Sequence, residues 1–141
     1  MAELVITCDG CSKGNPGPAG GGYTIQVRGG RVLEEGYVWL GICTNNQAEY
    51  GALIAAARAV NTRYPKYTRI IFVTDSNVVV QQLTKAWKIK DKILKQAAQK
   101  FWDTIGKKKY KVMHVYREMN VQADGLADKA VQTKSSYYSV R

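Results

Sequence analysis

The sequence predicts one α/β domain built on a five-stranded mixed sheet, three antiparallel strands followed by parallel ones, with helices on its faces. Three observations predict it. The chain has 141 residues without a linker, repeat or low-complexity block, which suits one core. Apolar residues alternate over much of the first 43 residues, and the spacing becomes helical from residue 45. Residues 69–74 (RIIFVT) are a near-continuous apolar run, typical of a strand covered on both faces. We expect a domain at 1–133 and a tail at 134–141.

The first three strands are predicted from alternation and turn residues. Residues 3–8 (ELVITC) and 23–28 (YTIQVR) alternate and contain β-branched residues. Residues 10–22 are rich in glycine and proline, so we expect an irregular loop there. Gly29-Gly30 is a hairpin signal, and a third strand follows at 32–43. These strands should form an antiparallel meander.

The rest of the chain predicts alternating helices and strands. Asn45 or Asn46 can cap a helix that continues to Val60. The elements expected after it are the strand at 69–74, helices at 76–86 and 91–105, a strand at 111–116 and a helix at 120–131. The tail, KSSYYSVR, is predicted to be either disordered or docked by its tyrosines.

Composition excludes several classes of protein. Apolar residues make up 45% and charged residues 23%, which is ordinary globular usage and not that of a disordered chain. No apolar run approaches the roughly 20 residues of a membrane-spanning helix, and no secretory signal is evident, so we expect a cytoplasmic protein with no membrane partner. Three cysteines (Cys8, Cys11 and Cys43) are too few for a disulfide scaffold, and we interpret them as small buried side chains.

The net charge of +10 predicts a polyanionic partner. Ten lysines and only two aspartates lie between Lys85 and Lys111, so this segment alone is +8. Trp87, Phe101 and Trp102 lie among these lysines. A solvated amphipathic helix would give the same composition, but lysines with interleaved aromatics favour contacts to phosphates and bases without sequence preference.

Four acidic residues lie where an α/β fold would bring them together: Asp9, Glu49, Asp75 and Asp124. Each alone could be a cap or a turn residue. Together their repulsion needs compensation, which a divalent cation supplies. Oxygen-only ligands suit Mg²⁺ or Mn²⁺, and two such ions beside a basic surface are typical of phosphodiester hydrolysis.

Five motifs, in this order and spacing, resemble type 1 ribonuclease H: TCDGCSKGNPGPAGGGYTI, TNNQAEYGALIAA, FVTDSNVVVQQL, WKIKD and NVQADGLADKA. The resemblance extends from about Val5 to Val131 and is to the form without a basic protrusion. It implies a ribonuclease H-like fold and an endonuclease that hydrolyses the RNA strand of RNA–DNA hybrids. It also implies that Asp9, Glu49, Asp75 and Asp124 bind two Mg²⁺ ions, with Mn²⁺ as a substitute. Asp128 does not match the motif, and we expect it to face solvent.

The resemblance also implies a substrate-binding set. Its members are Asn15, Gly17, Thr44, Asn45, Asn46, Gln47, Ser76, Asn77, Trp87 and Lys88. The first six match positions that touch the hybrid backbone, including RNA 2′-hydroxyls, although turn and capping roles would hold simultaneously. The only histidine, His114, lies inside a predicted strand and favours a core or sheet-surface role, so Arg117 is the candidate for approaching the scissile phosphate.

Two alternatives stay open from the sequence. One is a non-catalytic module that binds hybrids or duplexes, and the presence of all four carboxylates argues against it. The other is an integrase-like or junction-resolving nuclease acting on DNA, which Asn15 and the Thr44-Asn45-Asn46 run argue against. We expect a monomer that needs no protein partner and leaves 5′-phosphate and 3′-hydroxyl ends.

Overall fold

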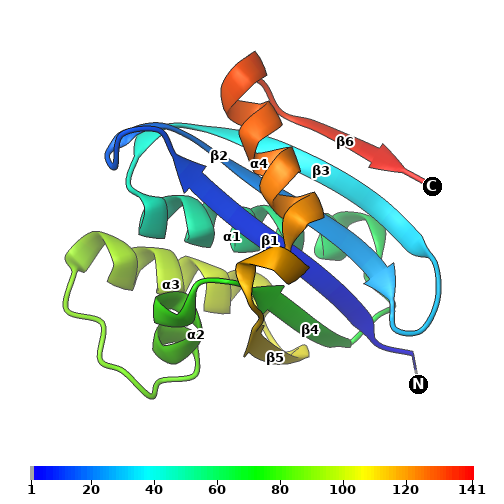
Figure 1. Ribbon diagram of the computed structural model, residues 1–141. Coiled ribbons are helices and arrows are strands. Elements are labelled where there is room, and N and C mark those ends of the chain that lie inside the picture. Colours follow the sequence, from blue (N-terminus) through cyan, green and yellow to red (C-terminus); the bar gives the residue numbers. More distant parts are fainter. Residues whose placement is uncertain (1) are drawn as a thin grey trace.

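The computed structural model describes residues 2–141, so residue 1 of the predicted domain lies outside the described residues. A six-stranded mixed sheet is covered by α4 on one face and by α1 and α3 on the other (Figure 1). The order along the chain is β1 (Leu4–Ser12), β2 (Gly17–Val27), β3 (Val32–Cys43), α1 (Asn45–Arg63), β4 (Arg69–Thr74), α2 (Asn77–Leu83), α3 (Lys92–Ile105), β5 (Lys109–His114), a 3₁₀ turn (Arg117–Met119), α4 (Val121–Thr133) and β6 (Tyr137–Val140). Across the sheet the order is β5-β4-β1-β2-β3-β6.

The sheet pairs as the pattern predicted, antiparallel within β1, β2 and β3 and parallel from β1 to β4 and β5. The β1–β4 ladder ends at the pair Cys8–Thr74. β1 continues alone beside β2 to Ser12, four residues beyond the predicted end. Asp9 and Asp75 therefore each follow the last parallel pair, at the carboxyl end of β4, where α/β folds place functional residues.

The prediction of an irregular loop at 10–22 was wrong except at 13–16. Gly20, Gly21 and Gly22 lie inside β2 because both neighbouring helices approach its backbone closely. A side chain at residue 20 or 22 would overlap α4, and one at residue 21 would overlap Ala52 of α1. The glycines are thus required by packing and not by a turn.

The prediction of five strands was also wrong, because part of the tail adds a sixth. β6 pairs antiparallel with residues 34–37 of β3. The Arg63 guanidinium lies 3.8 Å from the ring centroid of Tyr138, a cation–π contact that ties β6 to α1. Of the two outcomes predicted for the tail, docking by its tyrosines is the one observed.

Helix α1 begins at Asn45, one or two residues earlier than predicted, with Thr44 as its N-cap instead of Asn45 or Asn46. The Thr44 hydroxyl accepts from Gln47 N, and the Gln47 side chain accepts from Thr44 N, which makes a capping box.

Helix α2 ends at Leu83, short of the predicted residue 86, and Lys85 adopts a positive φ of 65°. β5 overlaps its predicted range but begins and ends two residues earlier in the chain. Helix α4 begins at Val121, so Asn120 lies just before it.

The core lies between the sheet and the helices α1 and α3. Phe101 is fully buried and meets Phe72 edge to face at 5.1 Å between ring centroids. Phe101 therefore cannot serve the surface role suggested by the lysine-rich segment, whereas Trp87 is 48% exposed. Among the described residues, no helix is both long enough and apolar enough to cross a membrane.

Candidate active site

Three carboxylates from three elements converge at the carboxyl end of β4. Asp9 comes from β1, Glu49 from the second turn of α1, and Asp75 from the residue after β4. One carboxylate oxygen from each lies within 4.8 Å of the others. Asp9 and Glu49 are buried, at 4% and 6% exposure, and Asp75 is partly exposed. This convergence is the one that the sequence predicted.

The fourth predicted acid, Asp124, joins the site from the opposite face of the sheet. It lies in the first turn of α4, and its carboxylate is within hydrogen-bonding reach of Asp9. Asn120 fixes the start of this helix, because its buried amide donates to the carbonyl of Cys8 at 2.8 Å. Asp124 is not one of the three oxygen donors that lie mutually within 4.8 Å.

The electrostatics of the two buried carboxylates are dominated by burial and by their mutual repulsion. Burial, together with the neighbouring negative charge of Glu49, raises the pKa of Asp9 to about 11. Burial raises the pKa of Glu49 to about 7, against hydrogen bonds from Asp9, the Gly10 N–H and Thr74. Three or four oxygen donors that repel one another fit a hard divalent cation.

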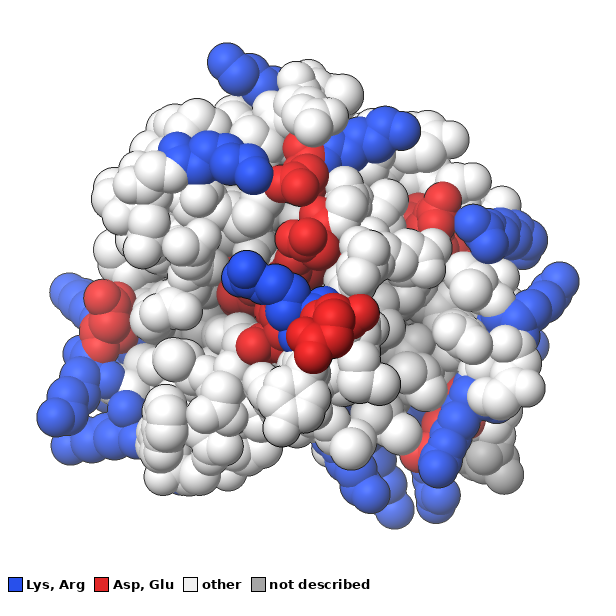
Figure 2. All heavy atoms as spheres, in the orientation of Figure 1, with Lys and Arg blue, Asp and Glu red and all other residues white. Residues whose placement is uncertain are grey.

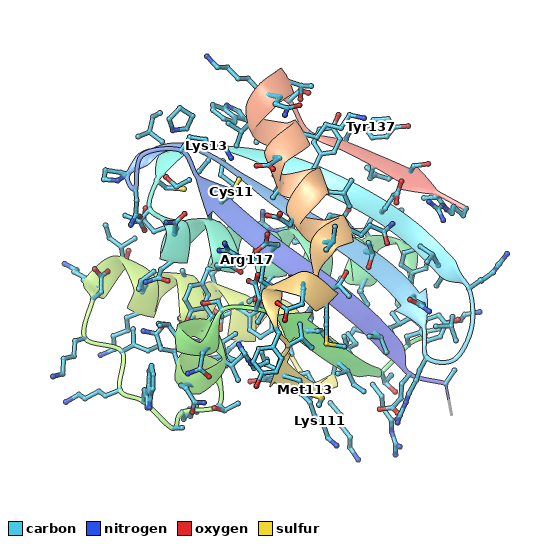
Figure 3. The ribbon with its side chains drawn as sticks, viewed as in Figure 1. Cys11, Lys13, Lys111, Met113, Arg117 and Tyr137 are labelled. Atoms are coloured by element: carbon cyan, nitrogen blue, oxygen red, sulfur yellow. The ribbon has the colours of Figure 1, made fainter. Side chains whose placement is uncertain are left out.

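A cavity of about 280 Å³ surrounds the carboxylates. Its lining is made of Asp9, Gly10, Cys11, Asn45, Asn46, Glu49, Asp75, Ser76, Arg117 and Asp124. Figure 2 shows acidic side chains gathered along the centre of this face, with basic side chains mostly around its margin. Arg117 lies at the centre of the same face (Figure 3), 86% exposed, with Nε 3.8 Å from Asp75 Oδ2. One exposed cation therefore stands at the mouth of an acidic pocket.

Asn15 and Asn45 hold the loop at residues 13–16 and the start of α1 together. Asn15 Oδ1 accepts from Asn45 N, and Asn45 Oδ1 accepts from Ser12 N, both at 2.9 Å. Since both amide oxygens are engaged, the two NH₂ groups remain as donors on an exposed surface. Gly17 begins β2 beside them, where a side chain would overlap the carbonyl of Lys13.

The other predicted substrate residues divide into two places. Asn46 and Ser76 line the carboxylate cavity, and Ser76 also caps α2. Asn77 is in the first turn of α2 and accepts from Gln81. Trp87 and Lys88 lie instead in a separate cavity of about 520 Å³, together with Lys85, Lys95 and Trp102.

Asp128 faces solvent in part, as expected, with 39% of its side chain exposed. Its carboxylate pairs with Lys13 Nζ at 2.7 Å, which joins α4 to the loop at residues 13–16, and the Cys11 thiol donates to it at 3.7 Å.

Cys8 is buried, and Cys11 and Cys43 are half-buried, all as free thiols. His114 is exposed on the edge strand β5, which confirms the sheet-surface placement and excludes the core.

Sequence reasoning missed two residues of the site. Gly10 lines the cavity, and its N–H donates to Glu49. The sequence offered no signal for this role, because Gly10 was assigned to the irregular loop expected at residues 10–22. Thr74 is fully buried and donates its hydroxyl to Glu49 Oε2 at 3.1 Å. The signal for Thr74 was its place immediately before Asp75 in a strand that is otherwise apolar.

This mixed sheet, with carboxylates converging beside its central parallel strands, defines the ribonuclease H-like class of proteins. Residues 7–130 match the family described as "Reverse transcriptase-like". The chain superposes on the crystal structure of RNase H1 from the archaeon Halobacterium salinarum with a TM-score of 0.88 and 36% identity, over 93% of this chain and 98% of that one. It superposes equally well, at 0.88 and 32% identity, on LC11-RNase H1 in complex with an RNA/DNA hybrid, over 93% and 98% of the two chains. The chain therefore belongs to the type 1 ribonuclease H family.

The length of the match differs between relatives. Ribonuclease HI of Halobacterium salinarum is 39% identical over 124 residues, which are 87% of this chain and 61% of that protein. This chain thus spans about three fifths of the length of that curated relative. The family is metal-dependent, in agreement with the buried acidic cluster.

Proposed function

We propose that this chain is an endoribonuclease that hydrolyses the RNA strand of RNA–DNA hybrids. The observation that carries the proposal is the convergence of Asp9, Glu49 and Asp75, with oxygens within 4.8 Å, in a fold shared with an RNase H1 bound to a hybrid. A fourth carboxylate, Asp124, lies within reach of Asp9. Every one of these residues comes from a single chain, so the proposal requires only a monomer.

The four carboxylates are the residues that would hold the cations, Mg²⁺ foremost and Mn²⁺ as a substitute. They fit, because all ligand atoms are oxygens and burial raises the pKa of Asp9 and Glu49. Two such ions, when bound, would activate a water molecule and stabilise the charge that develops on the leaving 3′-oxygen. Hydrolysis by water leaves 5′-phosphate and 3′-hydroxyl ends.

The groups around the carboxylates would place the RNA strand. Arg117 is exposed at the mouth of the cavity and can pair with a phosphate once the substrate arrives. The NH₂ groups of the exposed Asn15 and Asn45 remain as donors, because their oxygens are engaged, and they suit 2′-hydroxyl acceptors. RNA would thus be selected at the same edge of the sheet as the reaction.

The DNA strand would lie on the lysine-rich side. Trp87 offers an exposed ring in a cavity that also contains Lys85, Lys88 and Lys95. Aromatic stacking with nearby ammonium groups supports binding of a strand without reading its bases. The two strands of a hybrid would therefore meet two different surfaces.

The test is cleavage of labelled RNA–DNA, RNA–RNA and DNA–DNA duplexes of one sequence, with Mg²⁺, Mn²⁺ or EDTA. We expect cutting of the RNA strand of the hybrid with either metal, none in EDTA, and products with 5′-phosphate ends. Tight hybrid binding without cleavage in any metal would instead support a non-catalytic binding module. Cleavage of the all-DNA duplex would support a DNA nuclease.

A further inference from the structure

Thr74 is a fully buried polar residue whose hydroxyl has two partners. It is the last residue of β4 and has no exposed surface. Its Oγ1 accepts the backbone N–H of Ser76 at 3.1 Å and donates to Glu49 Oε2, also at 3.1 Å. Because the N–H can only donate, the hydroxyl proton must point to the carboxylate. The direction of this hydrogen bond is therefore fixed.

The position of Thr74 connects it to all three converging acids. Its backbone pairs with Cys8, the residue before Asp9, and it directly precedes Asp75. Its side chain reaches Glu49, the acid that comes from a helix and not from the sheet. The hydroxyl is thus the link that ties the α1 carboxylate to the strand ends bearing the other two.

The remaining contacts of Glu49 explain why this link matters. Besides Thr74, its carboxylate accepts the Gly10 N–H and lies against the carboxyl of Asp9. The Asp9 contact is between acids that repel one another when both are ionised. Within the described part of the chain, Gly10 and Thr74 are the neutral donors that contact Glu49 when it is ionised, and of these Thr74 is the one that acts through a side chain.

We propose that Thr74 is a positioning residue that holds Glu49 in the orientation in which it binds the divalent cation. The inference rests on the proposed function, since it takes the carboxylates as metal ligands. Groups that hydrogen-bond to metal ligands commonly change affinity or activity about 10–100-fold when removed. Thr74 would thus act on the metal and on turnover, and not on binding of the hybrid.

The experiment compares Thr74→Val and Thr74→Ala, which lack the hydroxyl, with Thr74→Ser, which keeps it. Thr24→Val is the matched control, because Thr24 is a buried threonine of the same sheet whose hydroxyl pairs with the hydroxyl of Thr7 instead of with a carboxylate. Mn²⁺ is titrated calorimetrically without substrate. Hybrid affinity in EDTA, melting temperature, kcat and KM are measured on the same samples.

We expect Thr74→Val and Thr74→Ala to weaken Mn²⁺ binding by about 10-fold or more and to lower kcat at limiting metal. Hybrid affinity in EDTA and KM should stay within about twofold, since a residue that touches no substrate contributes nothing to uniform binding. Thr74→Ser should recover most of the metal affinity, and Thr24→Val should bind Mn²⁺ as the unaltered protein does.

Two results would overturn the inference. One is unchanged Mn²⁺ affinity in both hydroxyl-free variants. The other is equal loss in Thr74→Ser, which would assign the effect to packing of the methyl group. Failure of the proposed function has a different signature: the unaltered protein would then leave the hybrid uncut, whatever Thr74 does to Mn²⁺ binding.

Discussion

The backbone of Gly10 lies directly against the backbone of Glu49. A side-chain carbon at residue 10 would overlap the carbonyl of Ala48 and the amide nitrogen of Glu49, while the Gly10 N–H donates to the Glu49 carboxylate. Because Gly10 has no side chain, α1 can approach β1 closely enough for the Glu49 carboxylate to reach Asp9. The separation of helix and strand at this point sets the geometry of the carboxylate cluster.

Substituting Gly10→Ala should move α1 away from β1 and damage both stability and activity. Overpacking of this kind costs about 1–3 kcal/mol of stability. The displacement of Glu49 should lower kcat at least 10-fold, because misplacing a reacting group by about 1 Å can cost about 100-fold in rate. Gly125→Ala is the control, since Gly125 is exposed in α4 with open space around its Cβ position and should gain about 0.5–1 kcal/mol. Urea unfolding and hybrid cleavage of both variants check this; equal behaviour would contradict it.

Substituting Asp9→Asn or Asp75→Asn should abolish cleavage while hybrid binding survives. Loss of a proposed metal ligand should exceed the roughly 100-fold effect typical of removing a group that only supports one. Burial and the charge of Glu49 raise the pKa of Asp9, so the folded site disfavours an ionised side chain there. A side chain that is always neutral avoids this cost, and the melting temperature in EDTA should hold or rise. Cleavage rates, hybrid affinity in EDTA and melting curves give the measurement.

Asp128→Asn is the matched control for these two variants. Asp128 lies one helical turn beyond Asp124 and pairs with Lys13 in a partly exposed ion pair. Exposed pairs contribute about 0–1 kcal/mol, so this variant should cleave the hybrid within a fewfold of the unaltered rate. Substantial turnover by both Asp9→Asn and Asp75→Asn would remove these residues from the catalytic set.

The sequence predicted the parts of this structure that depend on local pattern. The apolar run 69–74 is β4 to the residue, and the helical spacing at 91–105 predicted α3 within one residue. The strand directions and the convergence of Asp9, Glu49 and Asp75 also followed, because parallel pairing brings strand ends to one edge. Hydrophobic period and strand pairing were sufficient for these features.

What the sequence could not supply depends on distant partners. Gly20–Gly22 predicts a turn locally, and only the approach of α1 and α4 makes it a strand. The tail becomes β6 because the β3 edge and Arg63 receive it. The hydroxyl of Thr74 has a role only because α1 carries Glu49 to it. Each of these is a tertiary contact that no window of residues contains.

Acid should weaken the fold through Glu34. This fully buried carboxylate accepts hydrogen bonds from Tyr23, Arg63 and Tyr64, with the Arg63 contacts at 2.6 and 2.7 Å. Burial alone would raise the pKa of Glu34, but these hydrogen bonds outweigh it and lower the pKa. A lowered pKa contributes stability that is present above the unfolded value of about 4.3 and is lost as pH falls through the folded value.

The variant Glu34→Gln tests this contribution because it keeps the shape and removes the charge. At pH 7 it should be less stable by about 3 kcal/mol, the order expected when a buried ion pair loses one partner. The difference from the unaltered protein should shrink below about pH 4 and vanish in stronger acid. Urea unfolding of both proteins from pH 3 to pH 8 measures it, and a difference independent of pH would contradict the assignment.

Neutralising Lys88, Lys90 and Lys95 to glutamine should raise KM for the hybrid and change kcat less. Lys88 and Lys95 line the cavity beside Trp87, and Lys90 is exposed in the same segment. Removing interactions that are equally strong in the ground and transition states affects KM. The slope of log affinity against log salt should flatten by roughly 0.7–0.9 for each phosphate that the protein no longer neutralises.

The control for charge alone is the triple variant of Lys66, Lys129 and Lys134, each changed to glutamine. These lysines are also exposed but lie outside both the lysine-rich segment and the cavity with Trp87. It removes the same net charge and should leave the salt slope close to that of the unaltered protein. If both triple variants bind alike, the lysine-rich segment is a solvated surface and the hybrid is held elsewhere.

A DNA–RNA–DNA chimera paired with DNA should be cut only inside its ribonucleotide run. The NH₂ groups of the exposed Asn15 and Asn45 remain as donors, because their oxygens accept from the backbone of Asn45 and Ser12, and Asn45 also lines the carboxylate cavity. A 2′-hydroxyl can accept from such donors, and a deoxyribose has nothing there to accept. The products should carry 5′-phosphates, because a chain whose one histidine lies on an edge strand lacks the paired acid–base groups that make cyclic phosphates. Sequencing gels and phosphatase treatment of the fragments give both results. Efficient cutting within the deoxy segments would remove 2′-hydroxyl selection, and cyclic phosphate ends would rule out hydrolysis by water.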